Sequence, residues 1–517
     1  MAVDIDVIGA RSAIWLLSQL HLLFASFALG APIFIVLSEY LATPRGVRNW
    51  RIRLPLVVVV AVAALLGIMA MHTTVERIVV VMAALLLLSV LFLITPVGDH
   101  RYERLARETM KAATIAYSFA AITGGLFAFM LMGPYGDFSD HLAGQFGSIF
   151  AIYGLLIVVE SVLVYTYWYS WRSLAERKGL HITIGVVMIL VGTVMMFLMN
   201  GVGSYMLTPG DSPEAASVWG RINNPSWTGL NLHRFIANIT FGGFMVALFA
   251  AFMHLTTKNE EDRPFYDWMG YIGNFIGVGT LMVLPLAGYI YAKELFEYDA
   301  TISTFLMADK LSSFFVMQGV LVSLLFLGAN YYMWQSIQRV EGGARFLGYM
   351  RPILTAMVVA AVIWITPQTF LPDLTTDAPA GIDPASIIIT ERLAFIGLMM
   401  AKALAVTGII IFTFLTYMIY RRAVSTGTIR WGHIAPQAQY TLIFIPAVAV
   451  YLMALMGAIR ELARQDWHVY LQIRDTTPYW FTPTLGHTSV MAGLSTLVFF
   501  AFMTFIFWIS FKLGRAD

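Results

Sequence analysis

The chain has 517 residues, of which 59% are hydrophobic and only 12% are charged, and its formal net charge is +2. Soluble globular proteins carry roughly 25% charged residues, so this composition indicates a polytopic membrane protein. There is no basic tail and no large basic surplus, so nucleic acid is not an expected partner. Cysteine is absent, which excludes disulfides, iron–sulfur clusters, thiolate nucleophiles and covalently attached c-type haem.

Apolar runs long enough to cross about 30 Å of hydrocarbon predict about thirteen transmembrane helices in a single all-α membrane domain, residues 1–517. In chain order they are expected at 12–42, 54–73, 77–97, 111–133, 148–172, 180–203, 231–256, 266–292, 310–337, 349–366, 391–421, 437–460 and 489–513. The first run lacks a small-residue cleavage site, so we interpret it as a retained span and not as a signal peptide. The second and third are joined so closely that they form a helical hairpin.

Arginine and lysine residues predict the orientation, because short cytoplasmic loops retain positive charge. Basic segments on one side of the predicted spans include "TPRGVRNWRIR", "DHRYERLARETMK", "WRSLAERKG", "YRRAVSTGTIRWGH" and the tail "KLGRAD". We therefore expect the N-terminus outside and the C-terminus in the cytoplasm. The opposite side has longer connections, and loops of that length are usually functional.

Three side chains that can bind haem iron fall in the outer half of the predicted spans. A rise of 1.5 Å per residue places His21, in "SQLHLLFASFALG", about 13 Å below the outer end of its helix and Met317 about 10 Å below. His233 lies just inside the outer end of its helix. Met/His ligation gives a six-coordinate electron-transfer haem, whereas a single imidazole leaves a coordination position open. The alternative for each histidine is a simple hydrogen bond to a neighbouring carbonyl, and most of the 28 methionines must be packing residues.

Charged residues within the apolar runs raise further hypotheses. Glu160 lies near the middle of the bilayer, so its carboxyl must be protonated, paired or part of a proton path. Arg460, Glu461 and Arg464, in "AIRELARQDW", lie at the outer end of the twelfth span, where arginines either clamp haem propionates or extend towards the interface. Lys402 has no obvious partner. His181, at the start of the sixth span, is interpreted as a solvated boundary residue.

Several of these stretches together resemble subunit I of cytochrome bd quinol oxidases. The stretch "ARSAIWLLSQLHLLFASFALG" is similar to that family's first helix, in which an arginine precedes a haem-ligand histidine by ten residues; Arg11 and His21 keep this spacing. The stretch "INNPSWTGLNLHRF" is similar to the approach to its fifth helix. On that match His233 corresponds to the histidine of the six-coordinate haem b, and its methionine partner falls near Met317. The stretch "AIRELARQDW" resembles the family's outer "GRQPW" region.

The resemblance also divides the chain. It implies a first bd-like helix at 12–42, an inserted helical hairpin at 54–97, bd-like helices at 111–337, inserted helices at 349–421 and C-terminal bd-like helices at 437–513. The long outer quinol-binding loop of the family is reduced here to "AKELFEYDATISTFLMADK". In this alignment the glutamate that binds a high-spin haem falls within "YLMALMG", which has no carboxylate.

The resemblance implies a haem-binding membrane subunit of a bd-like respiratory complex in a bacterial or archaeal cytoplasmic membrane. Such a subunit would hold at least one haem b, and the resemblance also allows further haems, including haem d. It would oxidise quinol and would assemble with a second bd-like membrane subunit. Oxygen would be the acceptor and Glu160 would deliver protons. One alternative is a haem b conduit between the quinone pool and a cytochrome c or reductase partner. Another is a haem-free transporter or structural subunit in which Lys402 and Glu160 line a path.

Overall fold

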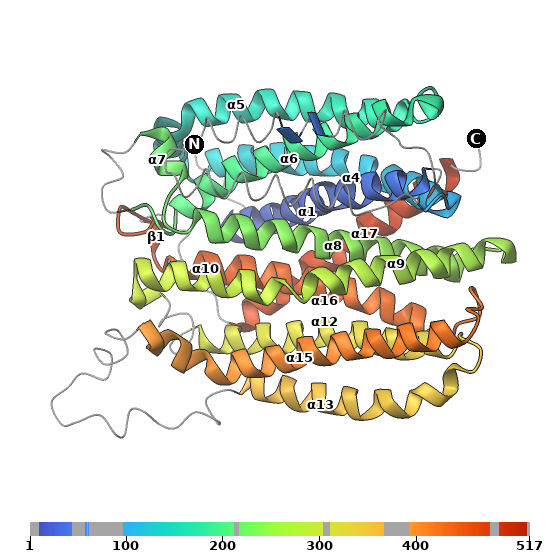
Figure 1. Ribbon diagram of the computed structural model, residues 1–517. Coiled ribbons are helices and arrows are strands. Elements are labelled where there is room, and N and C mark those ends of the chain that lie inside the picture. Colours follow the sequence, from blue (N-terminus) through green and yellow to red (C-terminus); the bar gives the residue numbers. More distant parts are fainter. Residues whose placement is uncertain are drawn as a thin grey trace, which may run out of the picture.

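The computed structural model describes residues 10–43, 57–58, 60–61, 97–210, 217–302, 311–366, 392–475 and 485–513. Within these ranges eleven helices are long and apolar enough to cross a membrane, which confirms an all-α polytopic membrane protein. Figure 1 shows that these helices run along a common axis, side by side. Of the two remaining predicted spans, 54–73 and 77–97, all but residues 57–58, 60–61 and 97 lie outside the described residues.

The long helices are α1 (Ala10–Ala42), α4 (His100–Met132), α5 (Gly136–Tyr169), α6 (Lys178–Tyr205), α8 (Trp227–Thr256), α9 (Arg263–Leu281), α10 (Leu284–Tyr298), α12 (Ser312–Ile337), α13 (Leu347–Ile365), α15 (Arg392–Thr426), α16 (Pro436–Ala463) and α17 (Leu485–Leu513). The short elements are α7 (Val218–Ile222), the 3-10 turns η1 (Ala175–Arg177), η2 (Glu260–Asp262) and η3 (Gly343–Phe346), and the antiparallel hairpin of β1 (Trp467–Val469) and β2 (Ile473–Arg474).

Three predicted boundaries need correction. Helix α4 begins eleven residues before its apolar run, because the Asp99 side chain caps it by accepting a 2.9 Å hydrogen bond from the backbone N–H of Arg101. Helix α5 also begins early, at Gly136, and its first turns are set off by the non-helical backbone of Phe146 (φ −128°, ψ 16°). The predicted span 266–292 consists of two helices, α9 and α10. Pro285 lies in the first turn of α10, where its missing N–H costs nothing.

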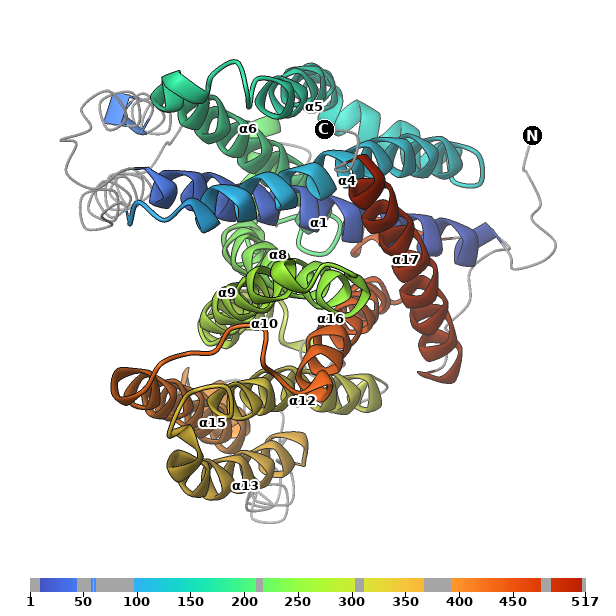
Figure 2. The ribbon, with the colours of Figure 1, turned by 90° about the vertical axis from the view of Figure 1, so that its right-hand side faces the viewer.

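Helix α8 lies in the middle of the bundle (Figure 2) and is the most buried of the eleven spans. It packs against α9, α1, α16 and α10. On one side α1 packs along α4 and against α6, and α5 covers α6; on the other, α12 packs against α16, α13 and α15. Helices α13 and α15 correspond to the inserted helices that were predicted at 349–421, and they lie at one edge of the bundle.

Small residues allow α8 to touch its neighbours through their backbones. A Cβ atom added to Gly273 of α9 would lie 2.6 Å from the backbone nitrogen of Ala247, and one added to Gly243 would lie 2.6 Å from that of Gly277. The pairs Gly243/Ala247 and Gly273/Gly277 are both spaced by four residues. This spacing aligns small residues along one face of each helix, and it is the usual basis of close helix contact in membranes.

The contact between α1 and α8 is equally close. A Cβ atom added to Gly30 would collide with the backbone carbonyl of Asn238, and one added to Gly242 would lie 3.0 Å from the carbonyl carbon of Gly30. No side chain separates the two helices at this point. The predicted haem-ligand histidines are therefore carried by two helices in direct backbone contact.

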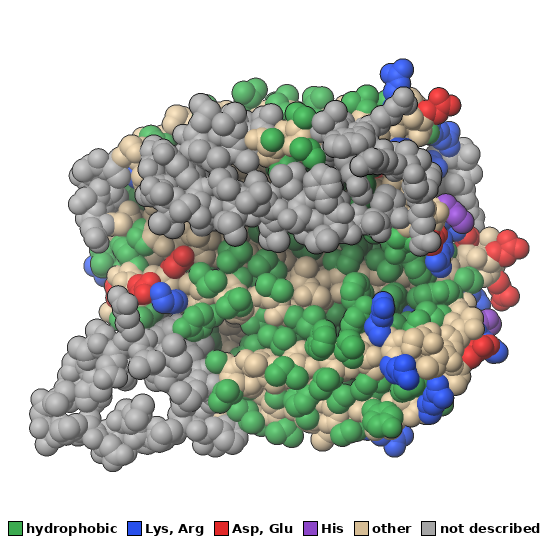
Figure 3. All heavy atoms as spheres, in the orientation of Figure 1, with side chains coloured by type: hydrophobic (Ala, Val, Ile, Leu, Met, Phe, Trp, Pro, Cys, Tyr) green, Lys and Arg blue, Asp and Glu red, His purple; other side chains and the backbone are tan. Residues whose placement is uncertain are grey.

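The basic connections gather at one end of the bundle. Lys178 contacts Glu103 at 2.5 Å, Arg104 contacts Asp262 at 2.7 Å and Arg430 contacts Glu341 at 2.7 Å, so the beginnings of α4, α6 and α9 lie near one another and the ends of α12 and α15 meet. Figure 3 shows most visible Lys and Arg side chains at the right-hand end, and mainly hydrophobic side chains on the described surface between the two ends. This grouping agrees with the charge pattern from which the orientation was predicted.

We expect Gly273→Val to lower the stability of the protein strongly, because the added side chain meets backbone atoms of α8 that cannot rotate away. Overpacking of this kind typically costs about 1–3 kcal/mol. Gly279→Val, on the same helix, is the matched control, since a Cβ atom there would meet nothing within 4 Å. Thermal unfolding in detergent should separate the two variants, and equal stability of both would contradict the close contact.

Candidate functional site

His21 is held between α1 and α4 in a defined protonation state. Its Nδ1 lies 3.0 Å from the carbonyl oxygen of Ala120, which can only accept a hydrogen bond, so Nδ1 must carry the proton. The lone pair of the neutral ring is then on Nε2, the arrangement that metal-binding histidines use. Gly124 makes room for the ring, because a Cβ atom there would lie 2.8 Å from Cε1.

His233 lies on α8, where it faces α10. Its nearest neighbours there are Gly288, whose added Cβ would lie 3.5 Å from Nδ1, and Tyr291, whose ring is stacked at a centroid distance of 6.4 Å. Nδ1 is buried and has no hydrogen-bond partner within the described part of the chain. Buried polar atoms are normally satisfied, so this imidazole is a ligand candidate.

Two arginines lie near these histidines. Arg234 donates from Nη1 to the side-chain oxygen of Asn200 at 2.8 Å, and Arg460 donates from Nη2 to the carbonyl oxygen of Gly203 at 2.5 Å. Each acceptor is neutral, and neither guanidinium forms an ion pair with any carboxylate that the structure describes. The charge of Arg460 acts on Arg234, and that of Arg234 acts on both His21 and His233.

Two like charges inside an apolar bundle repel each other, and both are costly to bury without a counter-ion. Arg234, Arg460 and both histidines are nevertheless only half-buried, so neighbouring side chains do not enclose them. The arrangement is suited to an anionic ligand that reaches the imidazoles with its apolar part and the guanidiniums with its carboxylates.

Arg464 and Glu461 form an ion pair with each other on the last turn of α16. Arg464 also donates from Nη1 to the carbonyl oxygen of His468 at 2.5 Å, which fixes the turn into the β hairpin. That hairpin closes over the ends of α6 and α10. The backbone N–H of Tyr470 donates a hydrogen bond to the carbonyl oxygen of Met206, and the Tyr470 hydroxyl donates one to Oδ2 of Asp299. These bonds give Arg464 a structural role, whereas the charge of Arg460 acts on Arg234 and Tyr291.

Glu160 is buried on α5 against α6 and α1. A Cβ atom added to Gly192 would lie 2.6 Å from Oε1 of Glu160 and 2.8 Å from Cδ2 of Leu29, which follows His21 by eight residues on α1. The hydroxyl of Tyr117 of α4 lies near the carboxyl and is 2.9 Å from Oγ of Ser161. The carboxyl therefore lies on the side of α1 that carries His21.

Met317 and Lys402 lie elsewhere. Met317 is half-buried on α12 and packs against the main core, while the neighbours found for His233 are on α10. Lys402 of α15 lies with Nζ 4.6 Å from the ring centre of Phe315. Since α15 and α5 lie on opposite sides of the bundle (Figure 2), Lys402 and Glu160 do not line a common path.

The sequence interpretation did not single out Arg234 or Asn200, which bonds both Arg234 and Asn231. Arg234 directly follows His233 in an otherwise apolar run. A charge at such a position is expensive in a membrane helix, and this signal alone was sufficient to identify it. The partnership with Asn200 joins residues 34 positions apart and is visible only in the fold.

Comparisons with known proteins bear on the same region. Residues 64–304 match the family model described as cytochrome bd terminal oxidase subunit I. The match includes Glu160 and His233, begins within the segment 54–97 and ends before Met317. No curated protein is a significant match. Among solved structures, the chain is similar to "The structure of bd oxidase from Geobacillus thermodenitrificans", with 12% sequence identity, 98% of both chains covered and a TM-score of 0.45.

Proposed function

The resemblance to the cytochrome bd oxidase subunit I family is confirmed by the match over residues 64–304, and from this premise we propose that the chain is the haem-binding membrane subunit of a bd-like quinol oxidase. The observation that carries the proposal is the pair of guanidiniums, Arg234 and Arg460, that lie without a described carboxylate partner beside two candidate ligand histidines.

The donor set fits haem. His21 presents Nε2, and His233 would be one ligand of a low-spin haem b; Met317, which the resemblance implies as the second ligand, is not among the neighbours found for His233. Haem bound at these positions supplies one-electron transfer and, where a coordination position is open, reaction with oxygen. Arg234 and Arg460 would neutralise the carboxylates of a bound haem by charge-assisted hydrogen bonds. Glu461 lies one turn from Arg464 and adds a carboxylate at the same end of α16.

Glu160 holds a proton at its carboxyl close to the helix that carries His21. The hydroxyl of Tyr117 lies near that carboxyl, and Gly192 leaves the space that the carboxyl occupies. The partners follow from the family: quinol as the electron donor and a second bd-like membrane subunit. In the proposed orientation the basic end of the bundle faces the cytoplasm and the β hairpin faces outwards.

The electron-conduit alternative rests on the absence of a carboxylate in "YLMALMG". Glu461 weakens this argument, because it follows Gly457 of that stretch by four residues, which is about one helical turn. It is the only acidic residue of α16. We therefore favour oxygen as the acceptor.

Absorbance spectra of the purified complex test the proposal. A Soret band and a reduced spectrum that carbon monoxide perturbs are expected for an oxidase. A haem spectrum that carbon monoxide leaves unchanged would favour the conduit, and a preparation without any Soret band would exclude both.

We expect His233→Ala to abolish the low-spin haem signal, because the variant loses the imidazole that α8 directs towards α10. His254→Ala is the control on the same helix, since His254 lies at the opposite end and contacts the carbonyl oxygen of Arg263. Reduced-minus-oxidised difference spectra measure the effect. Retention of the low-spin signal in His233→Ala, with normal haem content, would refute the assignment.

Gly124→Ala should perturb the second haem without removing its ligand. The new methyl group would overlap the His21 ring, so the imidazole must move and its bond to Ala120 must change. The adjacent Gly125→Ala should have no effect, because a Cβ atom there meets nothing within 4 Å. We expect the carbon monoxide difference spectrum of Gly124→Ala to differ from that of the unchanged protein, at least in amplitude, and that of Gly125→Ala to be unchanged. Identical spectra for the two variants would argue against His21 as a ligand.

A further inference from the structure

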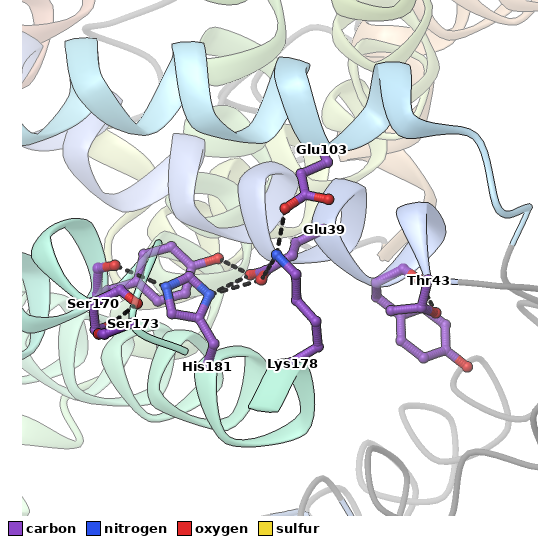
Figure 4. A network of polar contacts seen from close by, with 9 residues as sticks. Glu39, Thr43, Glu103, Ser170, Ser173, Lys178 and His181 are labelled. Carbon is purple, nitrogen blue, oxygen red and sulfur yellow. Dashed lines mark hydrogen bonds and ion pairs between the residues drawn. The ribbon is translucent and has the colours of Figure 1, made fainter. Parts of the chain in front are cut away.

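A second polar cluster lies at the basic end of the bundle, away from the histidines of the proposed haem site. Its centre is Glu39, near the end of α1, with a side chain that is 0% exposed, and His181, in the first turn of α6, which is 1% exposed. His181 is thus not the solvated boundary residue that the sequence indicated. Figure 4 shows the Glu39 carboxylate between Lys178 and His181, with Glu103 beyond Lys178.

The geometry requires a proton in this cluster. Nε2 of His181 lies 2.8 Å from the carbonyl oxygen of Tyr167, which can only accept, so Nε2 carries a proton. Nδ1 lies 2.7 and 2.9 Å from the two carboxyl oxygens of Glu39. Two lone pairs would repel at this distance, so a second proton lies between His181 and Glu39. It belongs either to an imidazolium beside a carboxylate or to a neutral imidazole beside a carboxylic acid.

The remaining contacts of Glu39 leave both states accessible. Tyr167 donates its hydroxyl to Oε2 at 2.6 Å, and Lys178 approaches Oε1 at 3.3 Å. The titratable groups found around the pair are thus Tyr167 on α5 and Lys178 on α6, with Glu103 on α4 behind Lys178 at 2.5 Å. With Lys178 and Glu103 compensating each other, the cluster is neutral when it holds the shared proton.

The cluster is open to water on one side. Lys178 is 22% exposed and Glu103 is 39% exposed, in contrast to the closed Glu39–His181 pair. A proton can therefore reach the pair from the surface through the side chains that separate it from solvent. This surface is the one that the proposed orientation assigns to the cytoplasm.

On the inner side, the contact between α5 and α6 leads from the cluster to Glu160. Gly185 of α6 packs against the Tyr167 ring, and Gly192 packs against the Glu160 carboxyl. Both pairs of positions are separated by seven residues, which corresponds to about 10 Å along either helix. Roughly three water molecules at hydrogen-bond spacing would cover this length, and the two glycines bring α6 close to Tyr167 and Glu160 at its ends.

We propose that the Glu39–His181 pair is a proton-loading site, which takes up a proton from the basic end of the bundle and passes it along the α5–α6 contact to Glu160. This inference rests on the proposed function, because it names the supply of the protons that reach Glu160. In the transfer, the O–H or N–H bond of the shared proton breaks, the proton moves to the carboxylate of Glu160, and a proton from water restores the pair.

A comparison within the molecule separates this cluster from a structural ion pair. Arg339 and Asp267 form an equally buried pair at the same end of the bundle, in which Asp267 also accepts a 2.9 Å bond from the backbone N–H of Gly432. A guanidinium does not release its proton under physiological conditions, so that pair can only fix the chain. Carboxyl and imidazole groups, in contrast, can both carry and release a proton, and Glu39 lies beside a partly exposed lysine, Lys178.

The first test measures proton uptake by the complete complex in vesicles during quinol oxidation, with a pH indicator on the side of the basic end. The double variant Glu39→Gln with His181→Gln keeps a hydrogen-bonded pair of similar size but holds no exchangeable charge. We expect turnover and proton uptake to fall about tenfold or more at unchanged haem content and unchanged KM for quinol. Glu260→Gln is the carboxylate-to-amide control and should stay within about twofold, since Glu260 lies at the same end of the bundle but is 84% exposed and contacts Arg263 outside the cluster.

The second test does not depend on haem. In infrared difference spectra of the purified chain between acidic and alkaline solution, the proposal expects either a carboxyl C=O band that is lost in Glu39→Gln or an imidazolium band that is lost in His181→Gln. Undiminished proton uptake in the double variant, or infrared bands of Glu39 and His181 that both stay unchanged at every pH at which the protein is folded, would overturn the proposal. Absence of haem would refute the proposed function but leave the infrared result to decide on the pair.

Discussion

No water is available in the hydrocarbon core of a bilayer to stabilise a charge, so every charged side chain there needs a partner inside the protein. The described ion pairs at the basic end of the bundle follow this rule. Asp267 neutralises Arg339, and Glu39 lies between Lys178 and His181. Arg234 and Arg460 depart from it, because their acceptors are the neutral oxygens of Asn200 and Gly203. This exception occurs beside His21 and His233. A dianionic, metal-containing ligand would neutralise the two guanidiniums and would also bind the imidazoles.

The position of these groups depends on the packing of α8. Glycines on α8, α1 and α9 let three backbones meet, so the side chains that matter project from helices that cannot slide past one another. Gly124 plays a different role, because it leaves room for an imidazole instead of a backbone. Glycine thus serves both to close the bundle and to keep open the places where larger groups fit.

Apolar run length predicted the eleven described spans because a membrane helix must be about 20 apolar residues long whatever its neighbours are. It misplaced the starts of α4 and α5, since a helix continues through polar residues when a cap such as Asp99 stabilises its first turn. His21 and His233 stood out as isolated imidazoles in apolar runs. The Glu39–His181 pair did not, because its meaning comes from a contact between residues 142 positions apart. Met317 shows the same limit, since only the packing of α12 decides what its sulfur reaches.

The backbone contact between α1 and α8 has a kinetic consequence. The rate of electron tunnelling falls exponentially with the distance between donor and acceptor, and it also falls when the surroundings must rearrange as the charge moves. Gly30 and Asn238 allow no side chain between the helices that carry His21 and His233. Two redox centres attached at these residues would therefore keep a nearly constant separation through the catalytic cycle, with a small reorganisation energy.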